Sequence, residues 1–446
     1  MKKKMLLTAA AILLAAGTVC AAEFDFVNSG SIKNSNLKKI SSPVPVAVAA
    51  DVPETRRAAA AKKMAEWTVM VFLNGKNNLE KSALRDVNEM EMAGSTDKVN
   101  IVVELGRMAG YDSSDGDWTG VRRYLIQKDE DPNKISSPVV QDLGAVDMGN
   151  YKNAIDFGKW AKKKYPARKY MFIFWNHGTG WVKAAGLYNS KGISYDDETN
   201  NHINTLQMAE VLKSIGGINV LASDACLMQM AEVGFELRNN VPLIVGSEEI
   251  EAGDGYTYDV LLGGLINNPS MKAEELAKLA VDSFSDYYDK KVGGYTHSFI
   301  NSRAMPQFMN LVNAFIAEVM KADDGEAAKY ARDNAWKFDY AENKDFYDFV
   351  SLLVSKSGNQ SVKTKGQALM SYITGKLIGH NRTKDEPGNY RSPANELSRA
   401  KGIAVYVPNR SVPYSYLEMQ WAKKTKWPDF VKWIASKDPP PPGFRP

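Results

Sequence analysis

Two short apolar runs, each leading to a reactive side chain, constrain the fold of this chain most strongly. Residues 170–175 lead to His177, and residues 218–222 lead to Cys226. Short runs rich in β-branched, aliphatic and aromatic residues that stop at Gly or Asp are typical of buried strands ending in loops. In open parallel α/β sheets, ligands bind just beyond the carboxyl ends of the strands. The sequence therefore predicts that a thiol and an imidazole meet at one edge of a sheet.

Further strand-like runs alternate with helical patterns along the first half of the chain. The expected strands are 67–73, 100–105, 121–126 and 241–245, and the expected helices are 79–90, 151–164, 205–215 and one directly after Cys226. This alternation predicts an α/β fold with a mainly parallel sheet and helices on both faces. Residues 270–400 show mostly helical patterns, and a lone strand at 402–408 is expected to add to the sheet edge.

The expected organisation divides the chain into five segments. These are a signal peptide at 1–22, a pro-segment or linker at 23–65, a sheet-containing domain at 66–268, a mainly helical C-terminal region with a late strand at 269–438, and a Pro-rich tail at 439–446. The first segment has three lysines, an apolar stretch and then small residues, which is the layout of a cleaved secretory signal. The second is dominated by Asn, Ser, Lys, Pro and Ala, as weakly ordered segments are.

Cysteine usage supports a reactive thiol. Cleavage after Ala21 or Ala22 removes Cys20 and leaves Cys226 as the single cysteine of an exported protein. A lone exported thiol is either reactive or buried and inert, and the nearby strand-end histidine favours the reactive state. We therefore expect a secreted or periplasmic enzyme without a disulfide.

Composition excludes several other classes of function. The net charge is +4 and the basic residues are scattered, so neither nucleic acid nor a membrane surface is an expected partner. The sequence holds no second long apolar segment, so no membrane span is expected. It also holds no P-loop, His-Glu-x-x-His or Cys-x-x-Cys motif. His202, His297 and His380 lack ligand spacing, so no metal site is predicted.

The residues around both reactive side chains resemble the clostripain family of bacterial cysteine peptidases, relatives of caspases, gingipains and legumain. Trp-Asn-His-Gly-Thr-Gly-Trp at 175–181 and Ser-Asp-Ala-Cys-Leu-Met at 223–228 carry the resemblance, which covers roughly residues 66–410. It implies that 66–268 form a caspase-like catalytic domain, a three-layer α/β/α sandwich. It also implies an endopeptidase that cuts proteins or peptides after Arg or Lys, as a monomer or a nicked two-chain form.

The catalytic roles follow from the chemistry of the matched residues. Cys226 is the expected nucleophile, at the start of a helix whose dipole lowers the thiol pKa. His177 is expected to protonate the leaving amine. The N–H groups of Gly178 and Cys226 are expected to bind the carbonyl oxygen as charge develops. No third, orienting residue can be identified from the sequence, so we predict a Cys–His dyad with a thioester intermediate.

Two aspartates are candidates for the substrate pocket. The family places an acidic residue two positions before the cysteine, here Asp224, and a carboxylate suits a guanidinium or an ammonium. The alternative is that Asp224 caps the following helix. Asp254 is expected to form a second acidic wall, although Asp between glycines is most often turn chemistry.

Self-processing is expected in the polar loop 183–197, because exposed loops are the usual place for nicking and family members process themselves in this interval. The loop offers Lys183–Ala184 and Lys191–Gly192. We favour Lys191–Gly192, because Lys191 is expected to lie further from the histidine turn and glycine extends with little strain.

Two acidic loops are candidates for a calcium site. Residues 112–117 lack EF-hand spacing and are expected to connect neighbouring strands, whereas residues 196–198 have oxygen ligands for a cation. No cofactor is expected to be required, but calcium stays open because some family members depend on it.

Two alternative functions share the same fold. A transpeptidase or ligase would use the same site with an amine in place of water. A catalytically silent surface-binding protein would retain only the fold, and the intact His177 and Cys226 argue against it.

Overall fold

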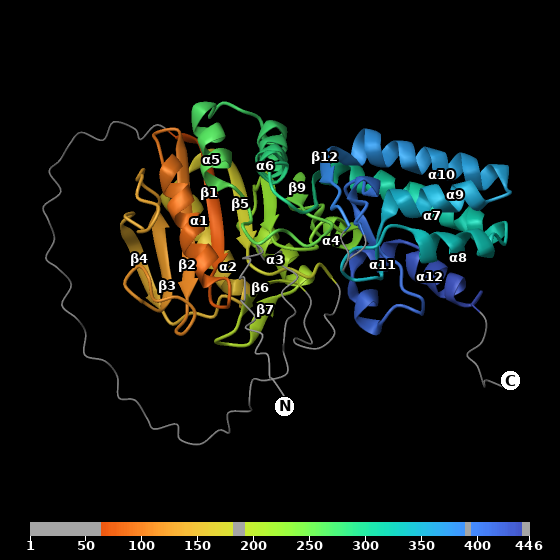
Figure 1. The fold of residues 1–446 in the computed structure, drawn as a ribbon, viewed down its shortest axis with the longest axis horizontal. Helices are drawn as coiled ribbons and strands as arrows, with labels where there is room; N and C mark the ends of the chain where they lie inside the picture. Colours follow the sequence, from red (N-terminus) through yellow and green to blue (C-terminus); the bar gives the residue numbers. More distant parts are fainter. Residues whose placement is uncertain (1–63, 182–191, 389–393, 439–446) are drawn as a thin grey trace, which may run out of the picture.

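The structure, a computed structural model, describes residues 64–181, 192–388 and 394–438. The predicted signal peptide at 1–22, the segment 23–63 and the tail at 439–446 lie outside the described residues. Figure 1 shows a sheet covered by helices on the left and a mainly helical part on the right. Among the described residues, no helix combines the length and the apolar character needed to cross a bilayer.

A nine-stranded sheet organises the first part of the molecule, in the order β12-β10-β9-β8-β5-β1-β2-β3-β4. Its strands are β1 (Ala65–Asn74), β2 (Val99–Arg107), β3 (Gly120–Leu125), β4 (Val139–Gly144), β5 (Ala167–Trp175), β8 (Val220–Asp224), β9 (Leu243–Gly246), β10 (Tyr295–Asn301) and β12 (Ile378–Lys384). The five central strands run parallel, and the two strands at each edge join by antiparallel pairing. The predicted mainly parallel sheet is confirmed.

Helices cover both faces of the sheet, as Figure 1 shows. On one face lie α1 (Glu80–Ala93), α5 (Tyr258–Asn267) and α6 (Ala273–Tyr288), and on the other α2 (Tyr151–Lys164), α3 (Thr205–Ile215) and α4 (Ala231–Leu237). Alternate residues of β1 point to opposite cores: Val71 packs below α1, and Phe72 contacts Phe157 of α2. Burial on both faces explains the near-continuous apolar sequence of the central strands.

The C-terminal part corrects two expectations. The strand predicted at 402–408 does not join the main sheet, because β13 (Ala404–Tyr406) pairs antiparallel with β11 (Asn343–Asp345). Conversely, β10 and β12 belong to the main sheet although both follow the predicted boundary at 268. β12 is mainly polar and β10 mixes polar with apolar residues, so neither gave a continuous apolar strand signal. The helices of this part are α7 (Met305–Lys321), α8 (Gly325–Asn334), α9 (Phe346–Lys356), α10 (Gln360–Tyr372), α11 (Gln420–Lys424) and α12 (Trp427–Ala435), with short turns at η1 (Ser302–Ala304), η2 (Ile373–Leu377), η3 (Leu397–Arg399) and η4 (Tyr414–Glu418).

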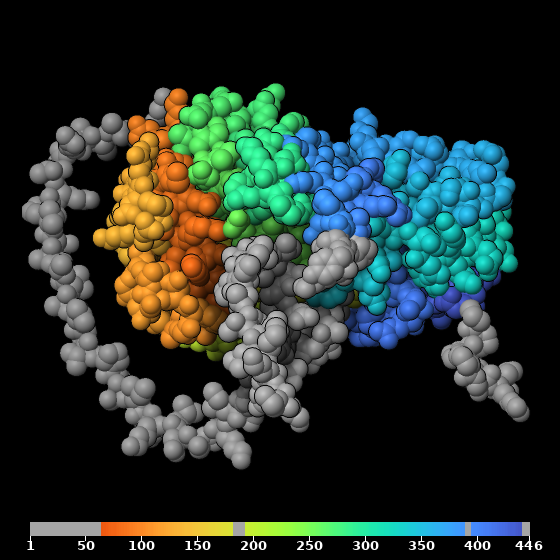
Figure 2. All heavy atoms as spheres, viewed as in Figure 1, coloured from red at the N-terminus to blue at the C-terminus, as the bar shows by residue number. Residues whose placement is uncertain are grey.

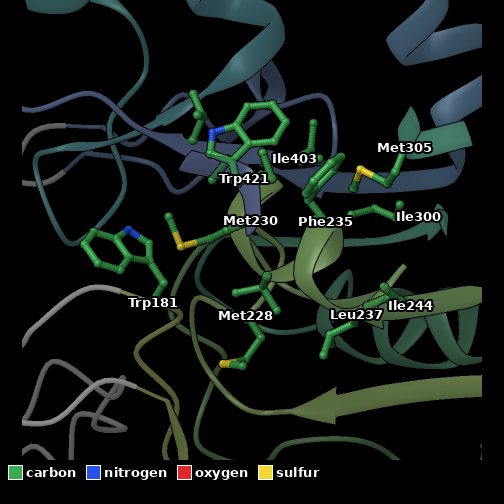
Figure 3. Close-up of a cluster of buried hydrophobic side chains, with 14 of the residues drawn as sticks. Trp181, Met228, Met230, Phe235, Leu237, Ile244, Ile300, Met305, Ile403 and Trp421 are labelled. Atoms are coloured by element: carbon green, nitrogen blue, oxygen red, sulfur yellow. The ribbon is translucent and has the colours of Figure 1, made fainter. Parts of the chain in front are cut away.

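One apolar core joins the sandwich to the C-terminal helices. Figure 3 shows Phe235 of α4 beside Trp421 of α11 and Met305 of α7, and Met230 between Trp421 and Trp181, all in the cluster that also contains Met228. Figure 2 shows the two parts abutting as one body on this face. Burying each such large apolar side chain contributes about 1.5–3 kcal/mol. The C-terminal part therefore helps to hold the segment that follows the cysteine.

Candidate active site

Strand register brings His177 and Cys226 to the same edge of the sheet. β5 and β8 are parallel neighbours, and Trp175 pairs with Asp224. Each reactive residue lies two positions beyond its paired residue, and both line one pocket. The juxtaposition expected from the sequence is therefore present.

The surroundings of Cys226 differ from the prediction in one respect. α4 begins only at Ala231, so Cys226 does not stand at the start of a helix. Met228 and Met230 are buried in the core shared with the C-terminal part, and Ala404 N–H donates to the Gln229 carbonyl. These contacts hold the segment after the cysteine in a non-helical conformation.

The half-buried Cys226 thiol instead faces the loop after β9. The backbone N–H of Glu251 donates to its Sγ at 3.4 Å. A donor aimed at sulfur favours the thiolate, which is the role the sequence had assigned to a helix dipole. The loop after β9 therefore contacts the thiol and also lines the pocket.

His177 has a partner that sequence reasoning missed. Its Nε2 lies 2.7 Å from Oδ1 of Asn78, in the loop after β1. An amide oxygen only accepts, so this pairing places the proton on Nε2 and leaves Nδ1 as the acceptor nitrogen of the neutral ring. Burial lowers the pKa of His177 to about 4, so the imidazole is neutral near pH 7. An Asn-rich run at the end of β1, next to the histidine strand, was the available signal.

Buried amides fix this histidine wall. The Asn176 side chain donates to the carbonyl of Asn74 and accepts from the backbone of Tyr195 in β6 (Ile193–Asp196). Asn77 donates to the Tyr195 carbonyl at 2.8 Å. β6 pairs with β7 (Asn201–Ile203) beside the main sheet. The His177 turn, the loop after β1 and β6 are therefore one hydrogen-bonded unit.

Gly178 lies against the backbone of the cysteine. A Cβ added at this position would be 2.5 Å from the Cys226 carbonyl oxygen and 3.0 Å from the Ala225 Cβ. Only glycine fits such an approach. This proximity is what the oxyanion hypothesis requires.

Asp224 lies inside the pocket wall and is 5% exposed. It accepts from the Tyr258 hydroxyl at 2.9 Å and from the Tyr256 backbone N–H at 3.3 Å. Burial raises its pKa to about 6, against the lowering effect of these hydrogen bonds. The helix-cap alternative is wrong, because α4 begins seven residues later with Met230 at its N-cap.

Asp254 also lines the pocket, but its carboxylate is already paired. Arg85 of α1 donates to it at 2.7 Å, and the Tyr287 hydroxyl donates at 2.8 Å. Partial burial acts to raise its pKa, but these two donors bring the pKa below its usual value. Asp254 therefore fastens the pocket loop to α1 and α6.

Basic side chains of the protein contact both of the acidic loops that were candidates for calcium. Lys76, itself fully buried, pairs with Asp196 at 3.4 Å and with Glu198. The 112–117 loop connects β2 and β3, and its carbonyls at Asp112 and Ser114 accept from Arg107. Within 64–181, 192–388 and 394–438, no cluster of three or more His, Cys, Asp or Glu residues could hold a metal ion.

The remaining histidines contact other aromatic or acidic side chains. His202 stacks on Tyr195, His297 is buried against Phe284, and His380 pairs with Asp282 at 2.7 Å. They are packing or surface residues, as expected.

Only Gly192 of the predicted cleavage residues is described; Lys183, Ala184 and Lys191 lie outside the described residues. Gly192 exchanges two hydrogen bonds with Thr179, which closely follows His177. Gly192 is therefore bonded to the histidine turn, whereas the comparison between Lys183 and Lys191 lies outside the described residues. A Cβ at Gly192 would come within 1.9 Å of the Ile203 carbonyl oxygen, so this position requires glycine.

A mainly parallel sheet between two helical layers, with a cysteine and a histidine beyond neighbouring strands, defines a caspase-like cysteine peptidase. A sequence model of the clostripain family matches residues 71–433. The chain is 26% identical over 413 residues to clostripain of Hathewaya histolytica, covering 78% of this chain and 76% of that protein. The chain thus belongs to the clostripain family, whose members are cysteine endopeptidases acting on proteins or peptides.

Solved structures share this fold. A secreted C11 cysteine protease from Bacteroides thetaiotaomicron, in complex with an irreversible peptide inhibitor, has a TM-score of 0.63 and 18% identity. An inactive zymogen C11 protease from Parabacteroides distasonis has a TM-score of 0.62 and 19% identity. Each match covers 81% of this chain and 99% of the other. These matches confirm the predicted caspase-like sandwich.

Proposed function

We propose that this cysteine endopeptidase is exported and cleaves after Arg or Lys, with Cys226 as nucleophile and His177 as general acid and base. One observation carries the specificity: the buried Asp224 carboxylate lines the same pocket as both reactive side chains. A buried carboxylate is costly unless a cation or hydrogen-bond donors compensate it. A substrate guanidinium or ammonium supplies such a cation beside the thiol.

The proposed mechanism has two halves, acylation of Cys226 and hydrolysis of the thioester. The Cys226 thiol passes its proton to Nδ1 of His177, and the sulfur attacks the carbonyl carbon of the substrate. The Gly178 and Cys226 N–H groups stabilise the developing oxyanion. His177 then protonates the leaving amine as the C–N bond breaks, which leaves a thioester. Water, deprotonated by the same imidazole, hydrolyses the thioester and regenerates the thiol.

Asn78 has the role of a positioning residue in these steps. Its amide oxygen holds the Nε2 proton of His177 and so selects the tautomer that can accept at Nδ1. The dyad predicted from the sequence is thereby extended to a Cys–His–Asn arrangement.

Self-cleavage between Lys191 and Gly192 is part of the proposal. The hydrogen bonds between Gly192 and Thr179 would tie the start of the second chain to the first. β5 and β8, on opposite sides of the cut, are neighbours in one sheet, so both chains would stay associated. Export is supported by the predicted signal peptide, and calcium dependence is a matter for direct assay.

A panel of fluorogenic peptides that differ only in the residue before the scissile bond tests this function. We expect cleavage of the Arg and Lys peptides and little turnover of neutral ones, with none by Cys226→Ala. Equal turnover of neutral and basic peptides would reject the specificity. Undiminished cleavage by the alanine variant would reject the mechanism.

A further inference from the structure

Asp86 is a second buried carboxylate in the pocket wall. It lies on α1, is 1% exposed, and lines the pocket together with Asp224 and Cys226. The sequence gave no reason to select it, because it lies in the middle of an amphipathic helix. Its place in the pocket follows from how α1 packs on the sheet.

Trp175 connects the two carboxylates. Its indole N–H donates to Asp86 Oδ2 at 2.7 Å, and its backbone pairs with that of Asp224 on the neighbouring strand. Paired residues of parallel neighbours point to the same face of a sheet. The Asp224 side chain therefore points to the face that α1 covers, toward Asp86.

Acidic groups outnumber basic ones around this pair. Glu89 of α1 and Glu251 of the loop after β9 add carboxyl groups, and Asp224 accepts from the Tyr258 hydroxyl and from the Tyr256 backbone N–H. His297 Nδ1 lies 3.5 Å from Glu251 on the far side. Burial and then the Asp224 charge raise the pKa of Asp86 well above its usual value.

The nearby cation is committed elsewhere. Arg85 donates to the Asp254 carboxylate at 2.7 Å and to its carbonyl at 2.8 Å. Its contact with Asp86 is longer, at 3.4 Å. Two carboxylates held together without a full counter-ion are unfavourable in an empty pocket, and an entering cation removes that cost.

We propose that Asp86 is a specificity-determining residue that, together with Asp224, receives the cationic side chain of the substrate. This inference rests on the proposed cleavage after Arg or Lys. A guanidinium has five donors in a planar fork, enough to bridge two carboxylates. Asp254, which the sequence had suggested as the second acidic wall, fixes Arg85 and the loop instead.

Matched peptides with arginine or citrulline before the scissile bond test the assignment, because citrulline keeps the shape of arginine without its charge. In Asp86→Asn, the amide oxygen can still accept from Trp175. We expect the arginine-over-citrulline ratio of kcat/KM to fall by about tenfold to a hundredfold, with citrulline turnover retained. Asp156→Asn, which changes an exposed aspartate paired with Arg123, is the matched control and should leave the ratio unchanged.

Each other outcome overturns the inference. An equal fall for both peptides would give Asp86 a purely structural role. An unchanged ratio in Asp86→Asn, with the ratio lost in Asp224→Asn, would reject Asp86 while the proposed function stands. A wild-type ratio near one would reject both. If the Asn variant does not fold, Asp86→Ser, whose hydroxyl also accepts from the indole, is measured in the same way.

Discussion

The two walls of the active site meet at one pocket but balance their buried charges differently. The histidine wall comprises His177, the loop after β1 and β6, and there the buried Lys76 is matched by Asp196 and Glu198. The cysteine wall comprises Cys226, Asp224, Asp86 and the loop after β9, where buried carboxylates gather with one committed arginine. Buried charges that are paired within the protein hold side chains in place, whereas buried carboxylates without a full counter-ion favour binding of a cation. We therefore expect the histidine wall to orient the imidazole and the cysteine wall to bind the substrate side chain.

The largest expected effect comes from the residues at which the walls meet. Cys226→Ala and His177→Ala should each reduce kcat by about a thousandfold or more, and the double variant should lose little beyond either single one. The two groups perform one catalytic act, so their losses do not add. Single-turnover and steady-state assays of purified variants measure this, with circular dichroism as the folding control. Independent, additive losses would contradict a shared act.

Removing a carboxylate from the cysteine wall should change the preference for basic substrates. Asp224→Asn should lower kcat/KM for Arg and Lys peptides by roughly thirtyfold to several-thousandfold, because one member of a desolvated charge pair is worth about 2–5 kcal/mol. Neutral peptides should be affected far less. A loss of thermal stability with the basic preference intact would place the recognition charge elsewhere.

Removing the buried cation of the histidine wall should lower the free energy of unfolding. Lys76→Met leaves Asp196 buried without its cation, and breaking a buried pair in this way costs about 3–5 kcal/mol. Chemical denaturation measures the loss. Adding Asp196→Asn should recover part of it, because the uncompensated charge is removed. A variant with wild-type stability would show that this network is not what fixes the wall.

A smaller effect is expected at Asn78, which lies at the surface and acts through the imidazole. Asn78→Ala should lower kcat by about tenfold and leave KM nearly unchanged. Asn78→Asp keeps an acceptor, so it should restore much of kcat. It should also raise the pKa of His177, because a carboxylate favours the imidazolium, and shift the acid limb of the pH profile upward. Unshifted profiles in both variants would reject the positioning role.

The mildest test changes only pH. The pKa of Asp224 is about 6, and a cation binds its ionised form. Lowering pH from 7 to 5 should therefore reduce kcat/KM for an arginine peptide more than for its citrulline counterpart, and the two profiles should converge at acid pH. Parallel profiles would mean that no carboxylate in the pocket titrates with substrate binding.

The sequence predicted correctly the strands that are buried on both faces of the sheet and apolar along nearly their whole length. β1, β5 and β8 are apolar along nearly their whole length, so their positions and the strand ends that carry His177 and Cys226 were predictable. β10 is also buried along nearly its whole length, but Thr296, His297 and Ser298 interrupt its apolar residues, and β12 is mainly polar beyond Ile378, so both strands were missed.

The site was only partly predictable for a related reason. The helix expected after Cys226 is present as α4, but it begins later than predicted, because Met228 and Met230 belong to a core formed with the distant C-terminal helices. Asn78 and Asp86 are ordinary residues of a loop and a helix, and only the fold brings them to the imidazole and the pocket. Local patterns thus located the proposed nucleophile and base, whereas the residues proposed to orient the imidazole and to select the substrate depend on tertiary packing.

Covalent labelling tests the central claim most directly, because it examines nucleophile and pocket in one measurement. An irreversible peptide ketone ending in arginine and its citrulline analogue are each reacted with the wild-type protein, and peptide mass spectrometry locates the adduct. We predict an adduct on Cys226, formed far faster with arginine than with citrulline. An adduct on another residue, or equal rates for the two reagents, would contradict a nucleophile at Cys226 beside a cation-binding pocket.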